Sequence, residues 1–281
     1  MNRKVKYSTV VPLYNDAANV TPLYVRLTQV CTFVLLAGVF PAVAQQAAIS
    51  APLTADEIMR RITNMNDSRA KTLYSYSSFR SYHLECHGIV SKKADMIVRA
   101  DYSWPNKKEF AIVSESGSGT IRRRVFRGLL EAELESMQEE NRQRSAITPE
   151  NYTFRVLSYQ KNDKDEFYVL EAQPRRKNKF LFRGRMWVDA KDFVITRVEG
   201  EPAVNPSWWT QKTHFTRTYQ KVEDLWLPES NESVTKVRIA GTALLTIKYR
   251  DYQIIRTPDV AVVSSQENSS SRVDGKADGN E

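Results

Sequence analysis

The sequence contains few of the residues that build disulfide frameworks, metal centres and nucleophilic active sites. Among 281 residues there are only two cysteines and three histidines. Two cysteines exclude a scaffold held together by several disulfides, so an ordinary hydrophobic core has to supply the stability. Scarce histidine leaves no usual general base for a Ser or Cys nucleophile, and no nucleophile-elbow motif is present. We therefore expect no enzymatic activity and no catalytic residues.

Two of the three histidines lie in the segment "HLECH", residues 83–87. On a strand, His83, Glu85 and His87 would point to one face, where three such side chains are able to chelate a transition metal. Their spacing matches no standard zinc pattern, and only His214 offers a further imidazole. We interpret the segment as a solvated strand face and expect no metal site and no other cofactor, with chelation as the alternative.

The chain also lacks an apolar run of the roughly 20 residues that a membrane-spanning helix needs. The longest run, residues 30–40, follows Arg26 and precedes Pro41-Ala42-Val43-Ala44, whose small residues suit signal peptidase. Residues 1–44 are thus predicted to be a leader that is cleaved after Ala44, with an uncleaved N-terminal anchor as the alternative. Residues 1–24 are either an extended part of this leader or a leftover of neighbouring coding sequence.

The segment at residues 8–30, "STVVPLYNDAANVTPLYVRLTQV", resembles the first strand and helix of family 2 glycosyltransferases. That family needs further parallel strands and an Asp-x-Asp pair for the metal on the sugar diphosphate. Neither follows in this chain, so we interpret this resemblance as non-functional.

The chain carries only a modest excess of positive charge. The net charge is +8, and it falls to +5 once the leader is removed. This modest value permits contact with anionic membrane surfaces but does not indicate nucleic-acid binding. The polar tail at residues 257–281 is rich in Ser, Gly and Asn and is predicted to be disordered, which leaves residues 45–256 as one domain.

Alternating apolar and polar residues dominate that domain. Ala94, Met96, Val98, Ala100 and Tyr102, for example, alternate with polar neighbours, as in a half-buried strand. The pattern predicts about ten or eleven strands, at residues 72–88, 92–103, 107–115, 118–124, 151–160, 166–173, 179–189, 193–199, 212–221, 229–239 and 242–254.

Two segments have helical spacing instead. Residues 54–65 begin with the capping-box pattern Thr54-Ala55-Asp56-Glu57, and residues 125–143 carry an apolar stripe. The predicted fold is therefore mainly β (α+β): a curled, incompletely closed antiparallel sheet, or half-barrel, whose concave apolar face is covered by an N-terminal helix and an inserted helix.

Two stretches, "KNKFLFRGRMWVDAKDFVITRVEGEP" (residues 177–202) and "LWLPESNESVTKVRIAGTALLTIKYRDY" (residues 225–252), resemble the LolA/LolB-like outer-membrane lipoprotein-sorting proteins. The resemblance runs over most of residues 54–254. It implies a periplasmic carrier that holds lipoprotein or lipid acyl chains in a hydrophobic cavity and moves them towards the outer membrane. It also implies an inner-membrane delivery complex and an outer-membrane receptor as partners, and we expect a monomer. The alternative is a non-catalytic sensor or scaffold module of the same fold that binds an envelope protein.

The predicted cavity lining consists of apolar and aromatic residues from the strands and the inserted helix. These are Tyr74, Tyr76, Tyr82, Met96, Val98, Tyr102, Leu130, Leu134, Met137, Phe154, Met186, Phe215, Tyr219, Leu245, Ile247 and Tyr249. The alternative for each is a place in a filled core, because strand faces pack cores more often than cavities.

A basic cluster surrounds the connection between two predicted strands. It contains Arg175, Arg176, Lys177, Lys179, Arg183 and Arg185. These side chains are predicted to meet anionic lipid headgroups or an acidic partner. A solvated loop and a protected strand edge are the alternative interpretation.

Overall fold

The computed structural model of the protein describes residues 53–70, 73–88, 91–103, 107–162, 165–204, 210–237 and 241–256. The predicted leader, the glycosyltransferase-like segment within it and the predicted tail lie outside the described residues and stay predictions.

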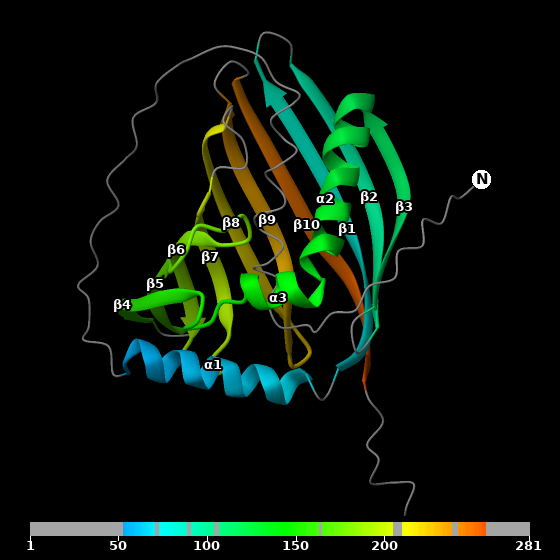
Figure 1. Ribbon diagram of the computed structural model, residues 1–281. Helices are drawn as coiled ribbons and strands as arrows, with labels where there is room; N and C mark the ends of the chain where they lie inside the picture. Colours follow the sequence, from blue (N-terminus) through cyan, green and yellow to red (C-terminus); the bar gives the residue numbers. More distant parts are fainter. Residues whose placement is uncertain are drawn as a thin grey trace, which may run out of the picture.

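Ten antiparallel strands form one open sheet (Figure 1). The strands are β1 (Leu73–His87), β2 (Lys92–Ser103), β3 (Lys107–Gly117), β4 (Tyr152–Lys161), β5 (Glu166–Pro174), β6 (Phe182–Asp189), β7 (Ile195–Pro202), β8 (Thr210–Val222), β9 (Leu225–Val237) and β10 (Gly241–Arg256). Their order is β3-β2-β1-β10-β9-β8-β7-β6-β5-β4, so β3 and β4 are the two edges. The predicted curled, incompletely closed sheet is confirmed.

Ten of the eleven predicted strands are present, and the strand predicted at residues 118–124 is wrong. Gly117 has a positive φ of 76° and ends β3, and the chain then turns into a π-helix, η4 (Ile121–Phe126). Ile121, Val125 and Phe126 are fully buried, and their i, i+4, i+5 spacing is helical. The helical stripe therefore begins about one turn earlier than the sequence pattern indicated.

The remaining helices are α1 (Ala55–Ala70), α2 (Arg127–Ser136) and α3 (Glu139–Ser145). The single helix predicted at residues 125–143 is interrupted at Gln138, whose extended backbone (φ −61°, ψ 138°) separates α2 from α3. We call η4, α2 and α3 the helical layer. This layer connects β3 to β4, so it joins the two edges of the sheet and crosses its concave side (Figure 1).

Helix α1 begins with half of the predicted capping box. The Glu57 backbone N–H donates to Thr54 Oγ1 at 3.3 Å, whereas the Glu57 carboxylate pairs with Arg60 and Arg61 instead of reaching back. Ile58, Met59 and Ile62 are buried in the core. In the part of the chain that the structure describes, no helix combines the length and apolarity needed to cross a membrane.

The predicted turn around Asp189 is present between β6 and β7. Asp189 Oδ1 accepts from the backbone N–H groups of Lys191 and Asp192, and Phe193 adopts a positive φ of 46°. Asp192 Oδ2 in turn accepts from Trp226 Nε1 at 2.8 Å and pairs with Lys221 at 2.7 Å. The two stretches that resemble the lipoprotein-sorting proteins are therefore in direct contact in the fold.

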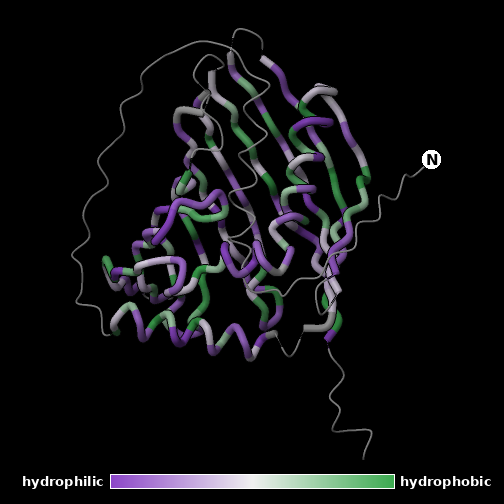
Figure 2. The backbone as a smooth tube through the Cα atoms, in the orientation of Figure 1, coloured by the Kyte–Doolittle hydropathy of each residue, from purple (hydrophilic) through white to green (hydrophobic). Residues whose placement is uncertain are grey.

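Strand periodicity places the core on the concave side of the sheet. Hydrophobic positions recur along the strands and the helical layer (Figure 2), and the large core cluster combines residues from α1, η4, α2 and most strands. A second, smaller cluster contains Tyr76, Tyr102, Leu225 and Leu227. Each strand pairs with its neighbours in the sheet order, so the ladder of sheet hydrogen bonds runs from strand to strand and not through the helical layer.

Candidate functional site

Most of the predicted lining residues are brought together on the concave side. Eleven of them belong to the large core cluster: Tyr82, Met96, Val98, Leu130, Leu134, Met137, Met186, Phe215, Leu245, Ile247 and Tyr249. Phe154 and Tyr219 are partly buried against it. Tyr76 and Tyr102 lie instead in the smaller cluster, where their rings stack at 5.3 Å. The side chain of Tyr74 lies outside the described part of the structure.

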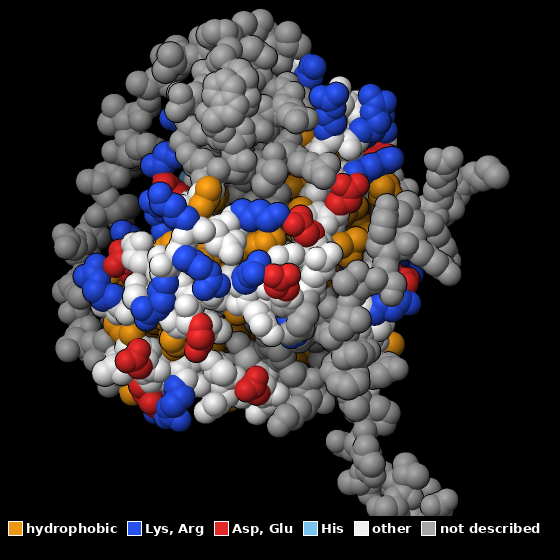
Figure 3. All heavy atoms as spheres, in the orientation of Figure 1, with side chains coloured by type: hydrophobic (Ala, Val, Ile, Leu, Met, Phe, Trp, Pro, Cys, Tyr) orange, Lys and Arg blue, Asp and Glu red, His pale blue; other side chains and the backbone are white. Residues whose placement is uncertain are grey.

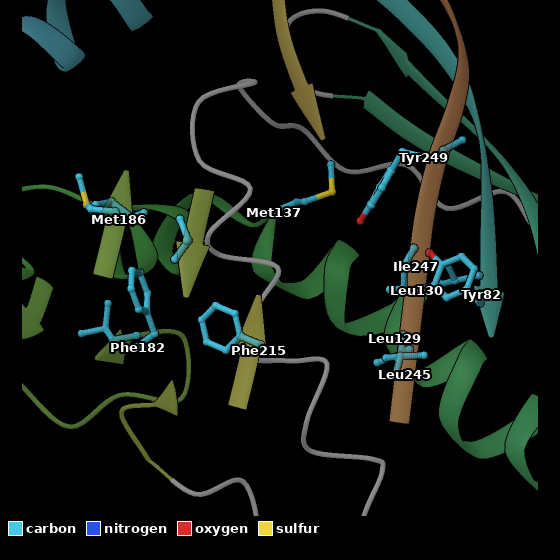
Figure 4. Packing of buried hydrophobic residues seen from close by; sticks show 14 of the residues in the cluster. Tyr82, Leu129, Leu130, Met137, Phe182, Met186, Phe215, Leu245, Ile247 and Tyr249 are labelled. Carbon is cyan, nitrogen blue, oxygen red and sulfur yellow. The ribbon is translucent and has the colours of Figure 1, made fainter. Parts of the chain in front are cut away.

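Figure 4 shows these apolar side chains in two groups on the concave side. Phe182, Met186 and Phe215 form one group from β6 and β8. Tyr82, Leu245 and Ile247 of β1 and β10 meet Leu129 and Leu130 of α2 in the other, with Met137 between the groups. Sequence reasoning omitted Phe182 and Leu129 from the lining, although both fit the strand and helix periodicity.

A buried ion triad fastens the helical layer to the sheet. Glu133 of α2 accepts two hydrogen bonds from Arg80 Nη1 of β1, at 2.8 and 3.0 Å, and also pairs with Lys108 Nζ of β3. The Arg80 guanidinium lies over the rings of Phe110 and Tyr249, 5.3 and 4.9 Å from their centroids. All three charged side chains are at least nine-tenths buried.

The electrostatics of the triad favour the ionised carboxylate. Burial by itself would raise the pKa of Glu133, but the charges of Arg80 and Lys108 and their hydrogen bonds outweigh it and hold that pKa at about 2. The same site raises the pKa of Arg80 well above its ordinary value, although burial opposes this, because Glu133 stabilises the cation. No local sequence pattern indicates this triad, because its members are 25 or more positions apart.

The predicted basic cluster is exposed throughout, but its members have different surroundings. Arg175 Nε donates to the carbonyls of Pro149 and Tyr152, and Arg176 donates to Asn151 Oδ1. These two side chains therefore hold the turn that precedes β4. Lys and Arg side chains are intermixed with Asp and Glu on the face that Figure 3 shows.

Two other members of the basic cluster lie on β6 opposite acidic residues of β7. Arg183 is the register partner of Glu201, and Arg185 is the partner of Glu199. Lys179 pairs with Glu135 of α2 at 2.6 Å. Opposite charges that face each other on neighbouring strands, as at Arg183 and Arg185, are typical of a solvated sheet face.

His83, Glu85 and His87 of the "HLECH" segment lie on the outer side of β1, whereas Leu84 and Cys86 are buried in the core. His83 Nδ1 is 2.6 Å from Asp95 Oδ1, and Glu85 lies between His83 and His87 at 3.1 and 3.3 Å. Asp95 and Glu85 raise the pKa of His83, with the hydrogen bond to Asp95 as the largest cause. The described residues contain no group of three or more His, Cys, Asp or Glu side chains arranged to hold a metal ion.

Comparison with known protein families and with curated proteins finds no match. Comparison with solved structures does find similar folds. A domain classed with outer membrane lipoprotein-sorting proteins, from Vibrio parahaemolyticus, is 12% identical with a TM-score of 0.43 and covers 76% of this chain and 98% of its own. A LolA superfamily protein from Nitrosomonas europaea is 11% identical with a TM-score of 0.34 and covers 74% and 96%.

The MucA/MucB complex of Pseudomonas aeruginosa is a further similar structure, with 8% identity, a TM-score of 0.24 and coverage of 69% and 93%. TM-scores below 0.5 carry no argument about function, which has to come from the residues of this chain.

Proposed function

We propose that this protein is a non-enzymatic carrier that holds the acyl chains of a lipoprotein or lipid between its sheet and its helical layer. The observation that carries the proposal is the connection of the helical layer. The helical layer is joined by the chain to the two edge strands and covers the apolar face of the sheet. The hydrogen bonds of the sheet run between strands and not through this layer. Such a layer is able to move off the sheet while the sheet stays folded.

The energies involved support a carrier of this construction. Exposing an acyl chain to water costs about 0.8 kcal/mol per CH₂, or roughly 12 kcal/mol for sixteen carbons. Separating Glu133 of α2 from Arg80 and Lys108 of the sheet costs at most about 3–5 kcal/mol, the typical loss when one partner of a buried ion pair is removed. Binding one acyl chain would therefore compensate for release of the triad, whereas the empty protein would keep its helical layer closed.

The route of such a carrier would run through the periplasm. Its proposed partners are an inner-membrane delivery complex and an outer-membrane receptor, with transient contact at an anionic membrane surface. In the alternative function, a sensor or scaffold module, the same concave face would stay filled by its own side chains and the partner would be a protein.

Native mass spectrometry with lipid extraction separates these two functions. Protein purified gently from cell envelopes should carry co-purifying acylated molecules if it is a carrier. Recovery of protein without any acylated molecule, but in a stable complex with an envelope protein, would contradict the carrier and support the partner-binding module.

Export predicts a defined N-terminus. Mass analysis of the exported protein should find Gln45 as the first residue, because Ala42-Val43-Ala44 follows the apolar run of the leader. An Ala44→Lys variant should block this processing and shift the mass upward by the uncleaved leader. Recovery of the chain with Met1 in the cytoplasm would contradict both cleavage and the periplasmic route.

Contact of the basic cluster with anionic headgroups is best tested at Lys177, because Arg175 and Arg176 also hold a turn. Lys177→Glu should weaken binding to anionic vesicles several-fold at low salt, since each charge near such a surface contributes about 1 kcal/mol. Screening should reduce the difference at high salt. Lys236→Glu, an exposed position on β9, is the matched control. Equal effects of the two variants would favour the solvated-loop interpretation.

A further inference from the structure

Strand β9 places polar side chains on the concave face at positions where its neighbour β10 places apolar ones. The concave positions of β10 include Leu245 and Ile247, each 1% exposed. The corresponding positions of β9 are Asn231, Ser233 and Thr235, which are 0, 3 and 0% exposed. Their neighbours Glu232, Val234 and Lys236 are exposed, so the alternation of the strand is regular and only its polarity is unusual.

The three polar residues differ in how their hydrogen-bonding groups are satisfied. Thr235 Oγ1 accepts from Thr213 Oγ1 of β8 at 3.3 Å. Asn231 Nδ2, Asn231 Oδ1 and Ser233 Oγ are buried and have no hydrogen-bond partner among the described residues. Buried polar atoms without partners are costly and rare in folded proteins. Apolar side chains of similar size at these positions would make the protein more stable. The polar atoms therefore point to a ligand that forms the missing hydrogen bonds.

The strand register places these atoms between a cation and the apolar surface. Asn231 is opposite Arg217 of β8 on one side and Ile247 of β10 on the other. Ser233 lies in the same way between Phe215 and Leu245. Opposite residues on one face of a sheet have Cβ atoms about 4.5–5.5 Å apart.

The polar groups of these side chains are suited to bind an oxyanion. Arg217 is 1% exposed and brings a permanent positive charge, Asn231 offers an amide N–H donor, and Ser233 offers a hydroxyl donor. The adjoining Phe215, Leu245 and Ile247 offer no polar side-chain group, and they suit a hydrocarbon chain. One molecule that satisfies both surfaces is an amphiphile with an anionic head and an acyl tail.

We propose that Arg217, Asn231 and Ser233 form a headgroup subsite for the carboxylate or phosphate of an anionic acyl amphiphile. The acyl tail then lies along Phe215, Leu245 and Ile247 beneath the helical layer. This inference rests on the proposed carrier function and adds a selectivity to it: among ligands of equal chain length, the subsite favours the anionic one.

The test compares ligands that share a sixteen-carbon chain. Palmitate, palmitoyl lysophosphatidate and the neutral hexadecanol are titrated below their micelle concentrations against a fluorescent fatty-acid probe. The wild type should bind the two anions at least about tenfold more tightly than the alcohol, because hydrogen bonds to charged groups are strong. The ratio between palmitate and lysophosphatidate then identifies which headgroup the subsite prefers.

The double variant Asn231→Leu, Ser233→Ala should lose about tenfold in affinity for the anions and less than about twofold for hexadecanol. Without ligand it should melt at a higher temperature than the wild type, because the unsatisfied polar atoms are gone. Ser233→Ala alone should show the same effects at reduced size and keeps the test decisive if the double variant does not fold. Thr235→Val, which removes a hydrogen-bonded hydroxyl from the same strand face, should leave the anion preference unchanged.

Several outcomes would overturn the subsite. These are equal losses for anions and alcohol in the variants, no loss for either, or binding of acetate or inorganic phosphate as tight as that of the amphiphiles. A wild type that binds hexadecanol as tightly as palmitate would overturn the subsite and leave the carrier function standing. A wild type that binds no acyl ligand would remove both.

Discussion

Replacing Glu133 with Gln is expected to destabilise the protein by about 3–5 kcal/mol, because the substitution leaves two buried cations without their anion. Arg80 and Lys108 are 2% and 5% exposed at the side chain and both pair with Glu133. For a domain of this size the loss corresponds to a fall in melting temperature of roughly 10 °C. Thermal unfolding followed by circular dichroism measures it directly.

Glu135→Gln is the matched control for this variant, since it makes the same chemical change on the same helix. Glu135 pairs with Lys179 at 2.6 Å, but both side chains are about half exposed. An exposed pair contributes at most about 1 kcal/mol, so the control should melt within a few degrees of the wild type. Equal losses at the two positions would show that the triad does not stabilise the closed helical layer.

The stability difference between wild type and Glu133→Gln should also depend on pH. The pKa of Glu133 is lowered to about 2 in the folded protein from 4.5 in the unfolded chain. A lowered pKa means that the carboxylate contributes its full stability above pH 4.5 and loses it as the pH falls towards 2. The difference between the two proteins should thus close over this acidic range. A difference that stays constant from pH 7 to pH 3 would contradict an ionised Glu133.

Local patterns in the sequence were sufficient to predict the sheet. Strand alternation at residues 94–102 and the Asp189 turn depend on neighbouring residues only, and both are present. The error at residues 118–124 has a local cause as well. Within residues 118–124, Ile121 is compatible with a strand, and its helical spacing to Val125 and Phe126 lies across the predicted boundary with the helix.

The polar features of the concave side were not accessible in the same way. Arg80, Lys108 and Glu133 come from β1, β3 and α2, and their pairing arises only after the sheet forms and the helical layer folds over it. Asn231 and Ser233 alternate as a strand should, so periodicity locates them on the buried face. It does not show whether their polar atoms find partners, because that depends on β8, on β10 and on what covers them.

Leu134→Glu is expected to abolish binding of a fluorescent fatty-acid probe while lowering the melting temperature much less than a charge placed within the sheet does. Leu134 lies in the last turn of α2 and is 9% exposed, and the helix ends two residues later, before the extended Gln138. A carboxylate facing an apolar surface is costly, but this end of the helix is able to swing outward and return the charge to water. The cost should therefore appear mainly as lost binding, and the loss of stability should not exceed that of releasing Glu133 from the triad.

Leu170→Glu gives the contrasting result from within the sheet. Leu170 of β5 is fully buried, pairs with Met186 on one side and Val156 on the other, and cannot turn outward without breaking the strand. This variant should lose several kcal/mol and unfold early, because a buried charge without a partner has no escape. If Leu134→Glu melts as early as Leu170→Glu, or still binds the probe, the helical layer is a fixed part of the core and not a movable cover over an acyl chain.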